Sequence, residues 1–125
     1  RICVHVILGL PGESRADVMA TAAEMARLQV DGIKLHLLHI LRGTPLGESY
    51  LAGEVATLTL PEYVELVVDF IERLPPGTLI QRLTGDGPRE LLLAPLWSIN
   101  KWEVLNAIDA ELERRGVRQG ARYRE

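Results

Sequence analysis

Residues 2–8 read Ile-Cys-Val-His-Val-Ile-Leu, a β-branched and almost unbroken apolar run. Such a run is typical of a central parallel strand that is covered on both faces. A Gly-Leu-Pro-Gly turn at 9–12 ends it. Ser14 and Asp17 have capping-box spacing before a helix predicted over residues 15–29, and a second apolar run covers residues 33–41. A strand–helix–strand unit with so long a crossover is expected to be parallel and right-handed.

The remaining sequence predicts further elements of the same kind. A short helix is expected over residues 46–53, and Thr59 and Glu62 form a second capping box before a helix that ends at the Pro-Pro-Gly of 75–77. Residues 78–83 are a short candidate strand, and residues 89–97 look irregular. Asn100 and Glu103 mark a last helix that stops at Gly116. The predicted fold class is therefore α/β, built from parallel βα units and a helical C-terminal part.

The composition limits the classes of function that the chain can have. The 125 residues, 47% hydrophobic and 25% charged, fit one globular domain. A net charge of −3 gives no strong field toward nucleic acid or an anionic membrane, although five arginines crowd the end, at positions 114, 115, 118, 122 and 124. The single cysteine, Cys3, excludes an internal disulfide and any all-cysteine cluster made by this chain alone. No apolar run reaches the ~18 residues of a membrane span.

Ligands of parallel α/β proteins gather at the carboxyl ends of the strands, which directs attention to residues 9–13, 41–45 and 84–89. All three segments are rich in Gly and Pro. The amides after Gly12 can hold an anionic group at the helix start, or the glycines are simply turn residues and Ser14 an ordinary cap. No Gly-Lys-Ser/Thr follows, so this is not a Walker phosphate loop.

Polar side chains inside the strands are a second signal. Lys34 and His36 share one face of the second strand while His39 points to the other, and His5 on the first strand can join them. Such residues are costly unless that face lines a wet cavity or meets partners. A metal site of His5, His36 and His39 is disfavoured, because His36 and His39 diverge. Arg82 lies near the end of the predicted third strand, where it can bind a carboxylate or phosphate. The alternative is a structural ion pair between Arg82 and Asp86.

The Gly-Leu-Pro-Gly-Glu of 9–13, after an apolar strand and about thirty residues before the Arg-Gly-Thr of 42–44, resembles the radical S-adenosylmethionine (SAM) superfamily. The two strands are similar to the fifth and sixth strands of its partial (β/α)6 TIM-type barrel. Four further segments resemble the YhcC-type group, which is related to the C-terminal region of the Elongator catalytic subunit: residues 34–39, 61–64, 81–86 and 100–102. The resemblance covers nearly the whole chain.

The resemblance implies that the intact parent protein uses SAM and a [4Fe–4S] cluster held by Cys-x3-Cys-x2-Cys. That motif is absent here and Cys3 cannot replace three converging thiolates, so neither cofactor is expected on this chain alone. By position, the backbone that receives SAM in the family falls on the two strand ends and the turn after the first: Leu8, Gly9, Leu10, Gly12, Glu13, Leu41 and Arg42. The expected substrate-side residues are His5, Lys34, His36, Arg82, Asp86 and Lys101.

We therefore expect the C-terminal part of a cytoplasmic radical SAM enzyme, inactive by itself, with barrel strands in residues 1–47 and an extension in residues 48–125. Its expected partners are the missing N-terminal half and, for the parent, a tRNA or other RNA substrate. A second copy is expected to pair on the exposed first strand. Two alternatives stay open at this point: a non-catalytic module that binds RNA or protein through its Arg-rich end, and a small α/β domain that binds a phosphorylated metabolite.

Overall fold

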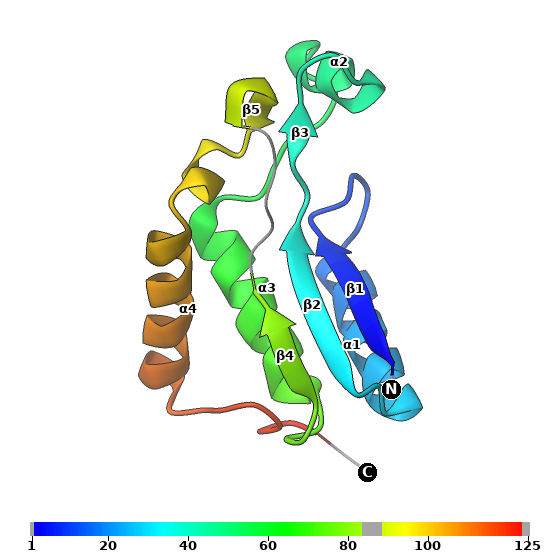
Figure 1. Cartoon of the computed structure of the whole chain (residues 1–125), viewed down its shortest axis with the longest axis vertical. Coiled ribbons are helices and arrows are strands. Elements are labelled where there is room, and N and C mark those ends of the chain that lie inside the picture. Colours follow the sequence, from blue (N-terminus) through cyan, green and yellow to red (C-terminus); the bar gives the residue numbers. More distant parts are fainter. Residues whose placement is uncertain (1, 84–88, 124–125) are drawn as a thin grey trace.

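The computed structural model describes residues 2–83 and 89–123, whose strands and helices are shown in Figure 1. The strands are β1 (Cys3–Leu8), β2 (Gly32–Leu37), β3 (Ile40–Leu41), β4 (Leu79–Arg82) and β5 (Leu92–Ala94). The α-helices are α1 (Arg15–Leu28), α2 (Pro45–Leu51), α3 (Leu60–Arg73) and α4 (Lys101–Arg115), with short 3-10 turns at Arg89–Leu91 and Leu96–Ile99. The predicted α/β class is thus confirmed.

The main sheet has the order β1-β2-β4, and both pairings are parallel. Cys3 lies opposite Gly32 and Leu8 opposite Leu37, so β1 and β2 run level with each other over their whole length. β4 joins the other side of β2, with a register shift after Ile33 that brings Lys34 opposite Arg82. β2 is therefore the central strand, and β1 is an edge strand among the described residues.

The hydrophobic core lies on one side of this sheet. Leu8, Ile33, Leu35 and Leu37 are buried there, in one cluster with residues of α1, α3 and α4. In Figure 1, α1 lies behind β1 and β2, and α4 stands beside α3. The side chains that alternate with these core residues consequently face the side of the sheet that the helices leave open.

The residues predicted to cap the helices do so in the structure. Ser14 and Thr59 each accept a hydrogen bond from the backbone of the residue three positions on, and both capping boxes are complete. Asn100 caps α4 in a similar way by accepting from the Glu103 amide. Gly116, at a φ of +65°, ends that helix in the left-handed conformation.

The single strand predicted over residues 33–41 is wrong in one respect, because the chain leaves the main sheet after Leu37. The Leu38 amide still donates to the Leu8 carbonyl, but β1 then ends at a glycine turn and supplies no further partner. Residues 40–41 form β3, which pairs antiparallel with β5. β5 lies in the stretch predicted to be irregular, and its three residues are too short a run to predict from sequence.

Candidate functional site

The open side of the sheet carries four basic side chains, His5, Lys34, His36 and Arg82, which we call the basic face. His5 is paired with Lys34 in register, and Lys34 with Arg82. Paired residues of neighbouring strands point to the same side of a sheet, and His36 follows Lys34 by two positions. Three strands therefore bring basic groups together on the side away from the core.

The imidazoles of His5 and His36 stack on each other within the basic face. Their ring centroids are 5.3 Å apart and their planes differ by 14°. Burial, together with the charges of His5, Arg82, Lys34 and His39, lowers the pKa of His36. Its Nε2 atom is buried and has no hydrogen-bond partner among the residues that the structure describes. The surroundings of His36 therefore favour the neutral form of its imidazole.

Beside the basic face, a side-chain hydrogen bond joins β1 to β4 and passes over Gly32 of the central strand. The Cys3 thiol donates to Oε1 of Gln81 at 3.0 Å. A Cβ on Gly32 would stand 3.3 Å from Nε2 of Gln81, so the absence of a side chain at this position makes room for the link. The Cys3 thiol is therefore occupied in a structural contact in this chain.

The predicted cofactor residues after β1 lie in an open turn. Gly9 and Gly12 have φ values of +92° and +78°, which side chains other than glycine rarely adopt. Glu13 follows, and one of its carboxylate oxygens is buried without a hydrogen-bond partner. Gly9 and Glu13 line a cavity of about 240 Å³ between this turn, Leu58 and α3. The strand end thus combines accessible backbone with an unsatisfied acceptor.

The other predicted site residues are more scattered. Because β3 leaves the sheet, Leu37 and not Leu41 lies level with Leu8, and the Arg42 amide donates to the Leu91 carbonyl at 2.7 Å. Lys101 begins α4, the helix that packs against α3. Asp86 lies outside the described residues, so its predicted partnership with Arg82 stays a prediction.

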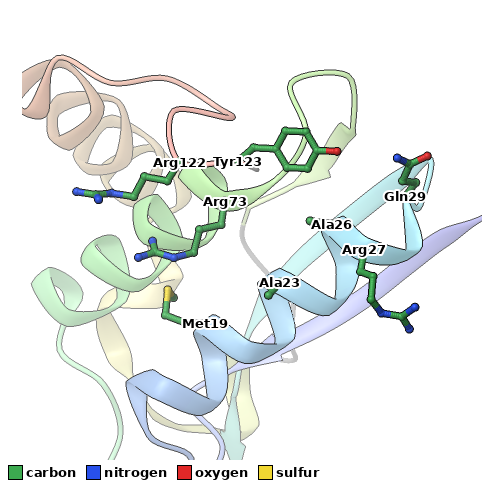
Figure 2. Close-up of a pocket in the computed structure, with 8 residues that line it drawn as sticks. All are labelled: Met19, Ala23, Ala26, Arg27, Gln29, Arg73, Arg122 and Tyr123. Atoms are coloured by element: carbon green, nitrogen blue, oxygen red, sulfur yellow. The ribbon is translucent and has the colours of Figure 1, made fainter. Parts of the chain in front are cut away.

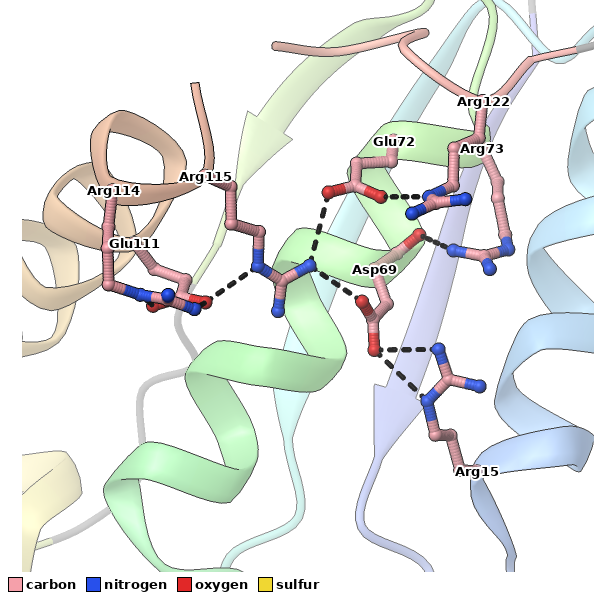
Figure 3. Close-up of polar contacts among 8 residues, drawn as sticks. All are labelled: Arg15, Asp69, Glu72, Arg73, Glu111, Arg114, Arg115 and Arg122. Carbon is pink, nitrogen blue, oxygen red and sulfur yellow. Dashed lines mark hydrogen bonds and ion pairs between the residues drawn. The ribbon is translucent and has the colours of Figure 1, made fainter. Parts of the chain in front are cut away.

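Sequence reasoning missed a charged cluster on α3. Asp69 and Glu72 are buried and accept hydrogen bonds and ion pairs from α1, α4 and the C-terminal segment (Figure 3). Arg115 reaches both, at 2.7 Å from Asp69 and 3.1 Å from Glu72. Arg15 and Arg122 add one pair each, at 3.1 and 2.8 Å. The sequence signal for this cluster is a pair of acidic residues, one inside the apolar run of residues 67–71 and the other just after that run.

This cluster also involves the Arg-rich end of the chain. Arg114 and Arg115 hold Glu111, and their hydrogen bonds lower its pKa to about 2. Burial works against the charge on Arg115, but hydrogen bonds to Asp69, Glu111 and Glu72 outweigh it and raise its pKa. The Arg122 backbone also donates to the Glu72 carbonyl. Three of the five terminal arginines are thus engaged within the fold.

A larger cavity, of about 620 Å³, lies elsewhere, between α1 and the C-terminal segment (Figure 2). Arg73 and Arg122 line it, but Arg73 donates to the Asp69 carbonyl and Arg122 pairs with Glu72. These two cations belong to the structural cluster, the third lining cation, Arg27, pairs with Glu24, and none of the residues predicted for SAM or substrate lines the cavity. We place the candidate site at the strand ends and the basic face.

Residues 2–83 and 89–123 hold neither a metal-binding cluster nor a membrane-spanning helix. No group of three or more His, Cys, Asp or Glu side chains is placed to hold a metal ion there. Within the same residues, no helix has the length and apolarity needed to cross a membrane.

Fold and site together define an α/β protein of parallel βα units whose first strand ends in a glycine turn beside an open basic face. Residues 30–114 match the family model described as the Radical_SAM C-terminal domain. The chain belongs to this family, and the resemblance stated from sequence is confirmed.

The curated relatives include uncharacterized protein YtqA of Bacillus subtilis, 52% identical over 96% of this chain, and protein YhcC of Escherichia coli, 36% identical over 97%. The chain spans only 37% and 39% of the lengths of these two proteins. A solved structure of Elp3 from Methanocaldococcus infernus covers 95% of this chain with a TM-score of 0.78, while the chain covers 28% of Elp3. At 18% identity this last likeness shows the shared fold.

Proposed function

We propose that this chain is the C-terminal part of a radical SAM enzyme, where it forms part of the SAM pocket and the substrate-side wall. The observation that carries the proposal is the parallel pairing of β1 with β2, while no strand of residues 2–83 or 89–123 pairs with the outer edge of β1. In a partial barrel that edge is where the preceding strand pairs. Family membership and the fraction of the relatives' length that the chain spans support the same conclusion.

The strand ends fit the binding of SAM. Glycines with positive φ leave backbone atoms accessible at Gly9 and Gly12, where a Cβ on Gly12 would have no neighbour within 4 Å. The unsatisfied oxygen of Glu13 suits an amino group, which SAM carries. We assign SAM contact to the residues predicted for it at the end of β1: Leu8, Gly9, Leu10, Gly12 and Glu13. Leu41 and Arg42 lie beyond the break after Leu37, so a SAM contact there stays a prediction. When bound beside a reduced cluster, SAM supplies radical chemistry.

The cluster itself does not fit this chain. Three thiolates must converge on it, and the only cysteine, Cys3, donates to Gln81 within the sheet. The electron supply therefore belongs to the missing N-terminal half, and this chain is inactive without it. Its own residues position the substrate and exclude water from the site.

On the substrate side we place the four residues of the basic face, with Asp86 and Lys101 as further predicted contacts. A cytoplasmic parent enzyme with a tRNA or other RNA substrate remains a prediction from the family resemblance.

The alternative function, a module that binds RNA or protein through a free Arg-rich end, loses its main support, because Arg114, Arg115 and Arg122 are engaged with acidic residues. In the absence of the N-terminal half, we propose that a second copy pairs on β1.

The first test is the genomic reading frame upstream of residue 1. Four βα units separate the first barrel strand from β1, so a three-cysteine cluster motif is expected within roughly two hundred residues. A frame without such a motif would refute the assignment.

The second test uses the full-length parent. Lys34→Met and Arg82→Gln are expected to abolish turnover while iron content and the cluster absorbance stay unchanged, because these residues lie on the substrate side. Arg27→Gln is the matched control, since Arg27 forms an exposed pair with Glu24 on α1. Full activity of both site variants would remove the substrate-side assignment.

A further inference from the structure

We propose that the basic face binds an anionic group, phosphate or carboxylate, that belongs to the substrate of the radical SAM enzyme and not to SAM. This inference rests on the function proposed above and specifies the class of its substrate. It starts from the arrangement of His5, Lys34, His36 and Arg82 on three adjacent strands.

The charge arrangement favours an anion. Two residues with permanent charge, Lys34 and Arg82, are register neighbours on β2 and β4. Two imidazoles from β1 and β2 stack beside them, and a bound anion would allow either ring to take up a proton. Guanidinium and ammonium groups are the usual partners of phosphate and carboxylate oxygens.

The state of His36 points the same way. The four groups that depress its pKa after burial are His5, Arg82, Lys34 and His39, and all of them are bases. Its Nε2 atom is buried without a partner, which costs free energy unless a ligand or a moved neighbour satisfies it. The His5 ring that stacks on it is exposed, so displacement of that ring opens the atom to a ligand.

The proposed anionic group and the proposed SAM contacts lie at different positions along the strands. The proposed SAM contacts begin at Leu8, the last residue of β1. His5 precedes Leu8 by three residues, which is about 10 Å along an extended strand. Lys34 lies level with His5, also well below the strand ends. An anion held by His5 and Lys34 therefore lies deeper along the strands than the proposed SAM contacts.

The test uses the 125-residue chain and nuclear magnetic resonance of its histidine ring protons. Titration with inorganic phosphate at constant ionic strength is expected to shift the His5 and His36 signals saturably. It should raise the apparent pKa of His36 by about half a unit or more relative to chloride. Acetate tests a carboxylate in the same way. S-adenosylhomocysteine is expected to leave these signals in place, since its contacts lie at the strand ends.

Variants decide whether the basic face is responsible. Lys34→Met and Arg82→Gln should each weaken the phosphate effect at least several-fold, while Arg27→Gln, which removes one charge from α1, should not. The methyl region of each spectrum reports whether the variant is folded, and a folded Arg82→Gln suffices if Lys34→Met unfolds. An effect that persists in the folded variants, or that neither phosphate nor acetate produces, overturns the inference. So does an equal, Lys34-dependent shift caused by S-adenosylhomocysteine, which would assign the group to SAM.

Failure here is distinguishable from failure of the proposed function. A chain that binds neither phosphate nor acetate can still belong to a parent whose upstream frame carries the three cysteines. A chain that binds phosphate while the upstream frame lacks them retains an anion site but loses the radical SAM assignment.

Discussion

At the scale of single residues, His36 is the side chain whose protonation is most coupled to its surroundings. It lies on the open side of the central strand, half-buried, stacked on His5 and near two permanent cations. Protonation adds a charge where burial and like charges both oppose it. The folded state thus favours neutral His36, whereas the unfolded chain lets it titrate at its ordinary value.

This asymmetry predicts a loss of stability in mild acid. Because the folded-state pKa of His36 is depressed, the unfolded state binds its proton first, and the stability present above about pH 6.5 falls as the pH drops through the folded pKa. The free energy of unfolding, from urea titrations between about pH 7.5 and about pH 5, should fall less steeply in His36→Gln than in the wild type. Identical slopes would show that His36 is not the cause.

At the scale of elements, α3 is the helix that contacts the sheet, α1, α4 and the segment after α4. Its apolar face packs on the sheet, and its two buried acids receive arginines from α1, α4 and the segment after α4. Gln119 adds hydrogen bonds to the Pro75 and Thr78 carbonyls, both at 2.7 Å. These contacts tie the C-terminal segment against the end of α3. A buried acid with a missing partner is expensive, so the cluster is sensitive to the loss of any one arginine.

Arg115→Met should therefore destabilise the chain by about 2 kcal/mol, since it removes hydrogen bonds from both buried acids while Arg15 and Arg122 remain. Arg114→Gln is the matched control, because the neighbouring Arg114 is exposed and pairs with Glu111 on the same helix, not with the buried acids. Chemical denaturation should show no measurable change in that control. Equal effects of both substitutions would mean that general charge, and not the buried acids, sets the stability.

At the scale of the whole molecule, the open edge of β1 is the dominant feature. An edge strand presents unpaired amides and carbonyls, and β1 also carries exposed apolar side chains, with Ile7 45% exposed. In the proposed parent, the preceding barrel strand covers this edge. The isolated chain has no described element there, so pairing between two copies is the available substitute.

We accordingly expect the isolated chain to form dimers as its concentration rises, measured by size-exclusion chromatography with light scattering. Ile7→Lys should shift the chain toward monomer, because a lysine on an edge strand opposes strand pairing. Leu51→Lys removes a similarly exposed apolar side chain from α2 and should leave the dimer intact. A dimer equally insensitive to both changes would place the contact elsewhere.

Local patterns were sufficient to predict the helices, the first two parallel strands and the family. Capping boxes at Ser14 and Thr59 and the alternation of Lys34 and His36 with apolar neighbours depend only on residues close in sequence. The tertiary structure alone decided where the second strand breaks, which acids the arginines meet, and that His5 stacks on His36. Each of these depends on partners far along the chain, whose position is set by packing and register and not by local pattern.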